Sequence, residues 1–174
     1  LEGIKEACEF LNYPVVSGNV SFYNGTNKKN IHPTPVIGGV GIINKLSNPI
    51  SHKLKKDKSL LLLIGKTFGH IEQSCFLKEN FSITDGSPPD INFFNEKNNG
   101  ETVLNLINLG LANSVHDVSN GGLIVALCEM AMGSNYGIKI EKPKKIINSF
   151  EYYFGEDQGR YIVEINKDNL INVE

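Results

Sequence analysis

The chain has 174 residues, a hydrophobic fraction of 40% and a formal net charge of −2 at pH 7. The length predicts one domain and a piece of another, and the composition is that of a globular protein rather than a disordered chain. The small negative charge argues against a nucleic-acid-binding surface, because such surfaces need clustered lysine and arginine.

Cysteine use and hydropathy exclude further classes. Cys8, Cys75 and Cys128 are widely spaced and form no C-x-x-C pair, so we expect neither a zinc site nor a disulfide framework. A reducing, cytoplasmic location fits this pattern best. The longest apolar run, residues 60–64, is far too short to cross a bilayer, so we expect no association with a membrane.

The first predicted element is a helix over residues 1–12, in which Leu1, Ile4, Cys8 and Leu11 share one face. The helical pattern starts at the first residue, without a cap or leader, and the chain ends as abruptly at residue 174. We therefore expect the chain to be a piece of a longer protein.

Two extended regions follow this helix. Residues 14–26, PVVSGNVSFYNGT, predict two short strands interrupted by a polar stretch at residues 17–19. Residues 36–43 are apolar and β-branched with three glycines, which predicts a strand that another backbone approaches closely. Residues 44–58 are polar and basic, and we place a domain boundary there, with the first domain ending at residue 44.

The remaining residues predict alternating strands and helices. A strand at residues 59–65 contains an unbroken apolar run, which indicates burial on both faces. The other expected elements are helices at 70–79, at 95–112 and from about 122 to Gly133, a loop at 84–91, and strands at 137–140 and 160–165. This mixture favours an α+β fold over a β-sandwich or a helix bundle.

The polar stretch after Val16 contains residue types suited to a ligand. Gly18 permits close approach to the backbone, the amide oxygen of Asn19 is a hard ligand suitable for Mg²⁺, and Ser21 offers a hydroxyl on the same face of a strand as Asn19. The same pattern is also typical of a β-bulge or turn, and spacing alone does not separate these interpretations.

A second polar stretch, HDVSNGGL, precedes a predicted helix. Asp117, Ser119 or Asn120 is expected to cap the first turn of that helix, and a helix N-terminus after glycines can also bind an anion. His116 is a weaker candidate for a catalytic base, because nothing in the sequence places a substrate beside it.

The third polar stretch, FGEDQGR, has two interpretations. Glu156 and Gln158 lie on one face of an extended segment and could hold ribose hydroxyls or a metal-bridged phosphate. Alternatively the stretch is a charged loop with an internal pair between Asp157 and Arg160. The chain has neither a G-x-x-x-x-G-K-[ST] loop nor a G-x-G-x-x-G motif.

Four segments taken together resemble a known family. PVVSGNVSFYN, IHPTPVIGGVGII, HDVSNGGLIVALCEMA and FGEDQGRYIVEI, in this order and at this separation, resemble the phosphoribosylformylglycinamidine synthases, and in particular the large synthetase subunit of bacteria. These enzymes belong to the aminoimidazole ribonucleotide synthetase superfamily. The resemblance covers nearly the whole chain.

The resemblance implies a fold and a reaction. Residues 1–44 would be the end of the second N-terminal-type synthetase domain, and residues 45–174 would be most of the second C-terminal-type domain, an α/β sandwich. The enzyme would use ATP to convert formylglycinamide ribonucleotide and glutamine-derived ammonia to formylglycinamidine ribonucleotide, with ADP and phosphate as products. Phosphoryl transfer of this kind depends mainly on positioning and on charge neutralisation by Mg²⁺.

The resemblance also implies site residues and partners. Gly18 would contact ATP, Asn19 would bind Mg²⁺ and Ser21 would contact the ribonucleotide. A glutaminase subunit and a small accessory subunit would be partners. The catalytic residues of the family lie outside this sequence, so we expect the 174-residue chain alone to be inactive.

The sequence departs from the family pattern at three places, one of which is residues 68–77, FGHIEQSCFL, where the common pattern has more glycine. Many relatives carry an acidic residue at the position of Gly25, and Asp157 stands where the corresponding loop of the first half has serine. Two alternatives also stay open: a non-catalytic module that binds a nucleotide or docks a glutaminase, and another superfamily member such as aminoimidazole ribonucleotide synthetase.

Overall fold

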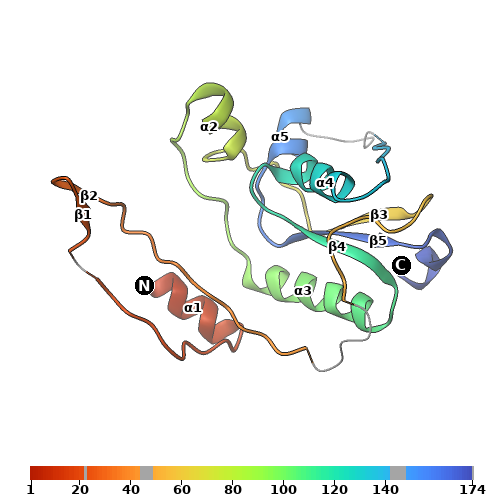
Figure 1. The fold of residues 1–174 in the computed structure, drawn as a ribbon, viewed down its shortest axis with the longest axis horizontal. Coiled ribbons are helices and arrows are strands. Elements are labelled where there is room, and N and C mark those ends of the chain that lie inside the picture. The colour runs from red at the N-terminus through yellow and green to blue at the C-terminus, as the bar shows by residue number, and fades with distance from the viewer. Residues whose placement is uncertain (22, 44–48, 142–147, 174) are drawn as a thin grey trace. The chain divides into compact units, whose positions relative to one another are not determined.

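A computed structural model of the chain describes residues 1–21, 23–43, 49–141 and 148–173. It separates into two compact units, an N-terminal unit, Leu1–Pro49, and a C-terminal unit, Ile50–Glu174. Figure 1 shows the elements of both units along the chain. The boundary predicted between residues 44 and 45 lies outside the described residues.

The N-terminal unit has little regular secondary structure. Helix α1, Glu2–Phe10, confirms the predicted first helix, and a hairpin pairs strands β1, Gly25–Thr26, and β2, Lys29–Asn30. Asn27 and Lys28 both have positive φ, as a tight two-residue hairpin turn requires. The strand predicted at 36–43 is wrong, and so are the strands flanking residues 17–19, because these segments are extended but have no strand partner among the described residues. Phe22, which belongs to the second of them, lies outside the described residues.

The C-terminal unit contains a three-stranded antiparallel sheet. Its strands are β3, Leu60–Ile64, β4, Ala112–Val118, and β5, Arg160–Ile165, in the order β3-β5-β4. The register pairs Leu62 with Val163 on one side of β5 and Val115 with Val163 on the other. Strand β5 therefore lies at the centre, although it is the last strand in the sequence.

Helices cover both faces of this sheet (Figure 1). Leu61 and Leu63 of β3 pack with helix α4, Gly122–Met132, whereas Leu60 and Leu62 pack with helix α3, Phe93–Asn108. The alternation of leucines between two hydrophobic clusters confirms the prediction that this strand is covered on both faces. The arrangement also confirms the predicted α+β fold class.

The remaining helices are short. They are α2, Cys75–Phe81, α5, Ser149–Phe154, and a 3-10 helix η1, Lys167–Asn172. Side chains cap three helices: the hydroxyl of Ser74 begins α2, and the amide oxygens of Asn92 and Asn148 begin α3 and α5. Among the described residues, no helix is long and apolar enough to cross a membrane.

Three predictions in this unit need correction. The helix expected over 70–79 starts five residues later, at Cys75, where Ser74 caps it. Residues 137–140 are not a strand, and β4 was not predicted because Asn113, Ser114 and Asp117 interrupt its apolar pattern. Pairing with β5 overrides that weak local signal, since β-structure depends more on neighbours than on propensity.

Candidate functional site

The residues singled out in SGNVS lie in an exposed, extended segment of the N-terminal unit. Gly18, Asn19 and Ser21 are all exposed, and a β-carbon placed on Gly18 would meet nothing within 4 Å. The backbone carbonyl of Ser21 accepts a hydrogen bond from the Asn24 side chain at 2.9 Å, and this bond is local. The described part of the chain thus presents these three residues together but does not enclose them.

These residues do not make a complete metal site by themselves. Asn19 supplies one hard oxygen ligand, but no cluster of three or more histidine, cysteine, aspartate or glutamate side chains suited to a metal occurs among the described residues. Mg²⁺ prefers near-octahedral oxygen coordination. An ion bound at Asn19 would therefore need further ligands from water, substrate or another polypeptide.

The FGEDQGR loop is an internal hydrogen-bonded structure. The buried carboxylate of Asp157 accepts backbone N–H bonds from Phe68, Gly69 and His70, at 3.0, 3.0 and 3.1 Å. The guanidinium of Arg160 lies 3.7 Å from the same carboxylate. The interpretation as an internal Asp157–Arg160 pair is confirmed, and both carboxylate oxygens of Asp157 are occupied by protein groups.

Arg160 is itself buried and closes the loop from inside. Its Nη2 donates to the carbonyl of Gly155 at 2.6 Å, its Nε donates to the carbonyl of Asp157 at 3.2 Å, and its Nη1 donates to the hydroxyl of Thr67 at 3.2 Å. Burial lowers the pKa of Arg160, while the charge of Asp157 acts in the opposite direction. The pair holds residues 67–70 against the start of β5.

Glu156 joins the beginnings of two helices. Its Oε1 accepts from the backbone N–H of Cys75, the first residue of α2, at 2.8 Å and from that of Gly121, the N-cap of α4, at 2.7 Å. A carboxylate is favourable at a helix N-terminus, where backbone N–H groups are unpaired. Glu156 thus occupies the backbone N–H groups to which an anion at these helix N-termini would bind.

This contact corrects the capping prediction for HDVSNGGL. Neither Asp117, Ser119 nor Asn120 caps α4 with its side chain; the N-cap is Gly121, which has φ +81°. The carbonyl of Ser119 accepts from the N–H of Gly122 at 3.0 Å. The backbone N–H of Gly121 instead donates to Glu156, 35 residues further along the chain, which local spacing could not reveal.

His116 is tied to neighbouring protein groups. Its Nε2 lies 3.1 Å from a carboxylate oxygen of Glu129 on α4, and its ring packs edge-on against His52 at a centroid distance of 5.4 Å. Its Nδ1 lies 2.6 Å from the carbonyl oxygen of Asp117. These contacts join β4 to α4. A substrate could reach a ring nitrogen of His116 only by replacing one of them.

A further buried carboxylate, Glu164, was not predicted. It lies on β5 and accepts hydrogen bonds from the backbone of Lys55 and Lys56 and from the hydroxyls of Ser59 and Ser114, at 2.7 to 3.3 Å. The one sequence signal was a glutamate within an otherwise apolar strand. These bonds tie the segment before β3 to the centre of the sheet.

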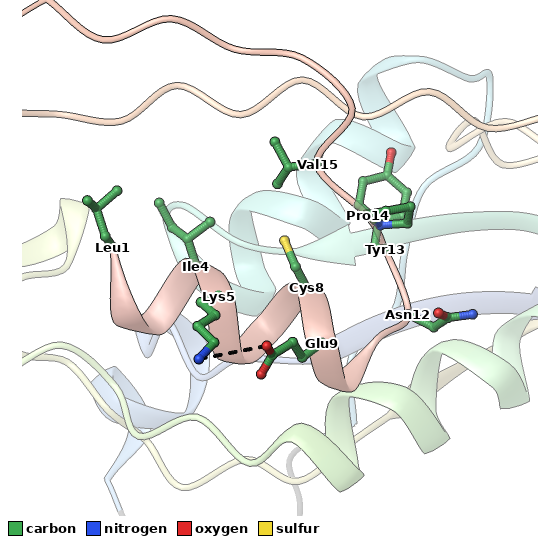
Figure 2. Close-up of a pocket in the computed structure, with 9 residues that line it drawn as sticks. All are labelled: Leu1, Ile4, Lys5, Cys8, Glu9, Asn12, Tyr13, Pro14 and Val15. Carbon is green, nitrogen blue, oxygen red and sulfur yellow. Dashed lines mark ion pairs between the residues drawn. The ribbon is translucent and has the colours of Figure 1, made fainter.

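The described residues line a cavity in each unit. The first, of about 620 Å³, follows one side of α1 (Figure 2). The second, of about 600 Å³, lies beside the edge strand β3; its lining includes the leucines of that strand and the polar residues Lys56, Lys58 and Lys139. Gly18, Asn19 and Ser21 line neither cavity.

Comparison with known proteins places the C-terminal unit in a family. Residues 58–173 match the family described as AIR synthase related protein, C-terminal domain. The chain belongs to this family. The hydrogen-bonded carboxylates Glu156, Asp157 and Glu164 lie within the AIR synthase related match, whereas Gly18, Asn19 and Ser21 lie before it.

Relatives from bacteria match nearly the whole chain. The phosphoribosylformylglycinamidine synthase subunit PurL of Pelagibacter ubique (strain HTCC1062) is 53% identical over 172 residues, 99% of this chain and 24% of the relative. The same subunit of Rhodopseudomonas palustris (strain BisB5) is 43% identical over 173 residues, which are again 99% of this chain and 24% of the relative. The chain thus spans about a quarter of the length of these relatives.

Solved structures show the same fold. T. maritima PurL complexed with FGAR aligns with a TM-score of 0.53 and 20% identity, covering 71% of this chain and 22% of that chain. T. maritima PurL complexed with ATP aligns with a TM-score of 0.51 and 17% identity, covering 71% and 20%. The chain therefore shares the fold of a part of each of these proteins.

Proposed function

We propose that the chain is part of a phosphoribosylformylglycinamidine synthase, an ATP-dependent ligase of de novo purine biosynthesis. The observation that carries this proposal is 53% identity to the Pelagibacter ubique PurL subunit across 99% of the chain. The reaction would convert formylglycinamide ribonucleotide and glutamine-derived ammonia to the amidine, with ATP converted to ADP and phosphate. A structure of T. maritima PurL with FGAR and another with ATP support the same choice of ligands.

The two units would then belong to two domains of the synthetase. We assign residues 1–44 to the end of the second N-terminal-type domain and residues 45–174 to the second C-terminal-type domain. The family match at 58–173 supports the second assignment. The separation of the chain into two compact units supports a boundary between them.

Gly18, Asn19 and Ser21 would form one wall of the synthetase site. In this assignment Gly18 contacts ATP, Asn19 binds Mg²⁺ and Ser21 contacts the ribonucleotide. Their exposure supports this role, because among the described residues no protein group occupies the side chains of Asn19 and Ser21. Bound Mg²⁺ would neutralise phosphate charge during phosphoryl transfer.

A glutaminase subunit and a small accessory subunit are the partners proposed for the assembled enzyme, in the cytoplasm. The word "subunit" in the names of the relatives supports an assembly. Three free cysteines among the described residues are consistent with a reducing compartment.

The proposal is tested in a chimera. This chain replaces the corresponding quarter of the Pelagibacter ubique subunit, and amidine formation from formylglycinamide ribonucleotide, ATP, Mg²⁺ and ammonia is measured. We expect an active enzyme, and at least a tenfold lower rate after Asn19→Ala. The matched control, Asn30→Ala on β2, should leave the rate unchanged. A folded chimera without activity would contradict the proposal.

The 174-residue chain alone is expected to form no amidine under the same conditions. The carboxylates of Glu156, Asp157 and Glu164 are bound by protein groups, and the candidate site has one wall only. The measurement is product detection with purified chain, ATP and ammonia. A rate above the enzyme-free background would show that these residues are sufficient.

One observation favours a second role for the C-terminal unit, that of a non-catalytic scaffold. The carboxylates of Asp157, Glu156 and Glu164 accept hydrogen bonds from protein groups: respectively from the loop at residues 67–70, from the helix N-termini and from the sheet. If the chimera folds and lacks activity while the chain still binds a glutaminase, this scaffold function replaces the synthetase assignment. Conversion of formylglycinamidine ribonucleotide instead would identify an aminoimidazole ribonucleotide synthetase.

A further inference from the structure

Three asparagines of the chain directly precede a glycine: Asn24, Asn99 and Asn120. An asparagine in this position loses ammonia when the backbone nitrogen of the glycine attacks its side-chain carbonyl carbon. Glycine favours the reaction because it has no side chain to block the approach and because its backbone is conformationally permissive. The glycine N–H must not be held in a hydrogen bond, and the asparagine side chain must be able to turn towards it. The structure separates the three pairs by these two requirements.

The pair Asn99-Gly100 is protected by a helix. It lies within α3, Phe93–Asn108, where each N–H donates to the carbonyl four residues earlier. The side chain of Asn99 also donates to the carbonyl of Gly159 at 2.9 Å. Both reacting groups are therefore held, and reaction would first require this part of the helix to unfold.

The pair Asn120-Gly121 is protected by a carboxylate. The N–H of Gly121 donates to Oε1 of Glu156 at 2.7 Å, and Gly121 is the N-cap of α4. A hydrogen bond to a charged acceptor is stronger than one between neutral groups. The glycine nitrogen of this pair is therefore not available for attack in the folded chain.

The pair Asn24-Gly25 lies where the hairpin of β1 and β2 begins (Figure 1). Gly25 pairs with Asn30, and the N–H of Ile31 donates to the carbonyl of Asn24 at 3.2 Å. Hydrogen-bonded and non-hydrogen-bonded pairs alternate along an antiparallel ladder. Gly25 and Asn30 therefore form a non-hydrogen-bonded pair, and the N–H of Gly25 points away from β2.

The side chain of Asn24 is held only by a local contact among the described residues. It is exposed, and its Nδ2 donates to the backbone carbonyl of Ser21 at 2.9 Å. Water competes for such a bond at the surface, so its net contribution is small. Asn24 thus meets both requirements that the other two asparagines fail.

We propose that Asn24 is a site of spontaneous deamidation. The backbone nitrogen of Gly25 loses its proton to a base in solution and forms a bond to the side-chain carbonyl carbon of Asn24. The bond from that carbon to Nδ2 breaks, and the nitrogen leaves as ammonia after taking up a proton. Water then opens the succinimide ring, at the side-chain carbonyl to give aspartate or at the backbone carbonyl to give isoaspartate. Nothing is oxidised or reduced, and water is the co-reactant.

Both products alter the segment that carries the candidate site. The amide donor to the carbonyl of Ser21 is lost, and a negative charge appears on the same segment as Asn19. Isoaspartate also adds a methylene group to the backbone, which disturbs the pairing of Asn24 with Ile31. We therefore expect deamidation to lower amidine formation, and this effect rests on the proposed function.

The modification is measured on the folded 174-residue chain by mass spectrometry of its proteolytic peptides, since each event adds about 1 Da. We expect Asn24 to react at least tenfold faster than Asn99 and Asn120, and faster as the pH rises. In the chain unfolded by urea, the three rates should be similar, because no fold then protects any of the pairs. Similar rates in the folded chain, or a slower rate at Asn24, would overturn the proposal.

Two variants test the role of the glycine. Gly25→Ala should slow the reaction of Asn24 at least tenfold. The matched control is Gly38→Ala in the same unit, where a β-carbon would meet nothing within 4 Å, and it should leave the rate unchanged. An unchanged rate in Gly25→Ala would show that the Gly25 nitrogen is not the attacking group.

The effect on the candidate site is measured separately, on the chimera. Its amidine-forming activity should fall in proportion to the fraction of Asn24 converted, whereas the Gly25→Ala chimera should keep its own activity over the same time. Full activity after complete conversion would overturn the effect on the site and leave the proposed function intact. A folded chimera that is inactive before any conversion would contradict the proposed function, while the peptide measurement still decides the chemistry at Asn24.

Discussion

At the scale of single residues, Asp157 organises the loop before β5. Its carboxylate accepts three backbone N–H bonds and lies beside the buried guanidinium of Arg160. Buried polar groups of this kind contribute little when satisfied but cost much when one partner is removed. The consequence for the protein is structural, because no oxygen of Asp157 is left for a ligand.

Asp157→Asn is therefore expected to destabilise the chain by about 3 kcal/mol, since it leaves Arg160 without its counter-ion and turns an amide N–H₂ towards backbone donors. Urea unfolding measures the change. Asp85→Asn, at an exposed loop residue, is the control and should stay within about 0.5 kcal/mol of the parent. Equal stability of the two variants would mean that the buried pair contributes nothing.

Glu96 gives a pH dependence at the same scale. Its carboxyl lies against the backbone of Gly159, where a β-carbon would come within 2.9 Å of it, and burial raises the pKa of Glu96. An acid whose pKa is higher in the folded state contributes most to stability below its unfolded pKa and loses that contribution as pH rises through the folded pKa.

The stability of Glu96→Gln relative to the parent should therefore rise between about pH 4, near the ordinary glutamate pKa, and pH 7. Unfolding free energies of both proteins at several pH values provide the measurement, and the values at the acid end serve as the internal control. A difference that is constant across this range, or that falls, would contradict the assignment.

At the scale of elements, helix α4 begins at two glycines for steric reasons. Gly121 and Gly122 have φ of +81° and +71°. A β-carbon on Gly122 would lie 2.6 Å from the carbonyl oxygen of Gly155 and 2.7 Å from the carbonyl carbon of Phe154. The Gly-Gly pair thus lets the start of α4 approach the end of α5, which also brings Glu156 to its position at the helix N-terminus.

Gly122→Ala should destabilise the protein by at least about 2 kcal/mol, because it adds a left-handed backbone penalty to a clash with the backbone. Thermal or urea unfolding measures this loss. Gly137→Ala, where a β-carbon would meet nothing within 4 Å, is the control and should change stability little. A tolerated Gly122→Ala would show that α4 and α5 can move apart at low cost.

At the scale of the whole molecule, the hydrophobic core belongs to one unit only. Both clusters of buried apolar residues lie in the C-terminal unit, on the two faces of the sheet. Among the described residues of the N-terminal unit none is buried. Stability measured on the chain should therefore report on Ile50–Glu174, since cooperative unfolding requires a core.

A chain of residues 50–174 is expected to unfold in urea at the same midpoint and with nearly the same cooperativity as the 174-residue chain. The comparison requires only circular dichroism of both proteins. A large fall in midpoint, or loss of cooperativity, would show that Leu1–Pro49 contributes to the core of the C-terminal unit.

Elements with a local signal could be predicted from the amino-acid sequence. The apolar face of α1, the leucine run of β3 and the helix after the Gly-Gly pair follow from periodicity, and the order of the polar motifs was enough to indicate the synthetase family.

Which polar residues are available to a ligand depends instead on the tertiary fold. The carboxylates of Glu156, Asp157 and Glu164 accept hydrogen bonds from groups 35 to 109 residues away, so their immediate sequence does not show which of them is left for a ligand. Extended segments such as 36–43 failed as strand predictions for the same reason, since a strand exists only where a second backbone supplies its hydrogen bonds.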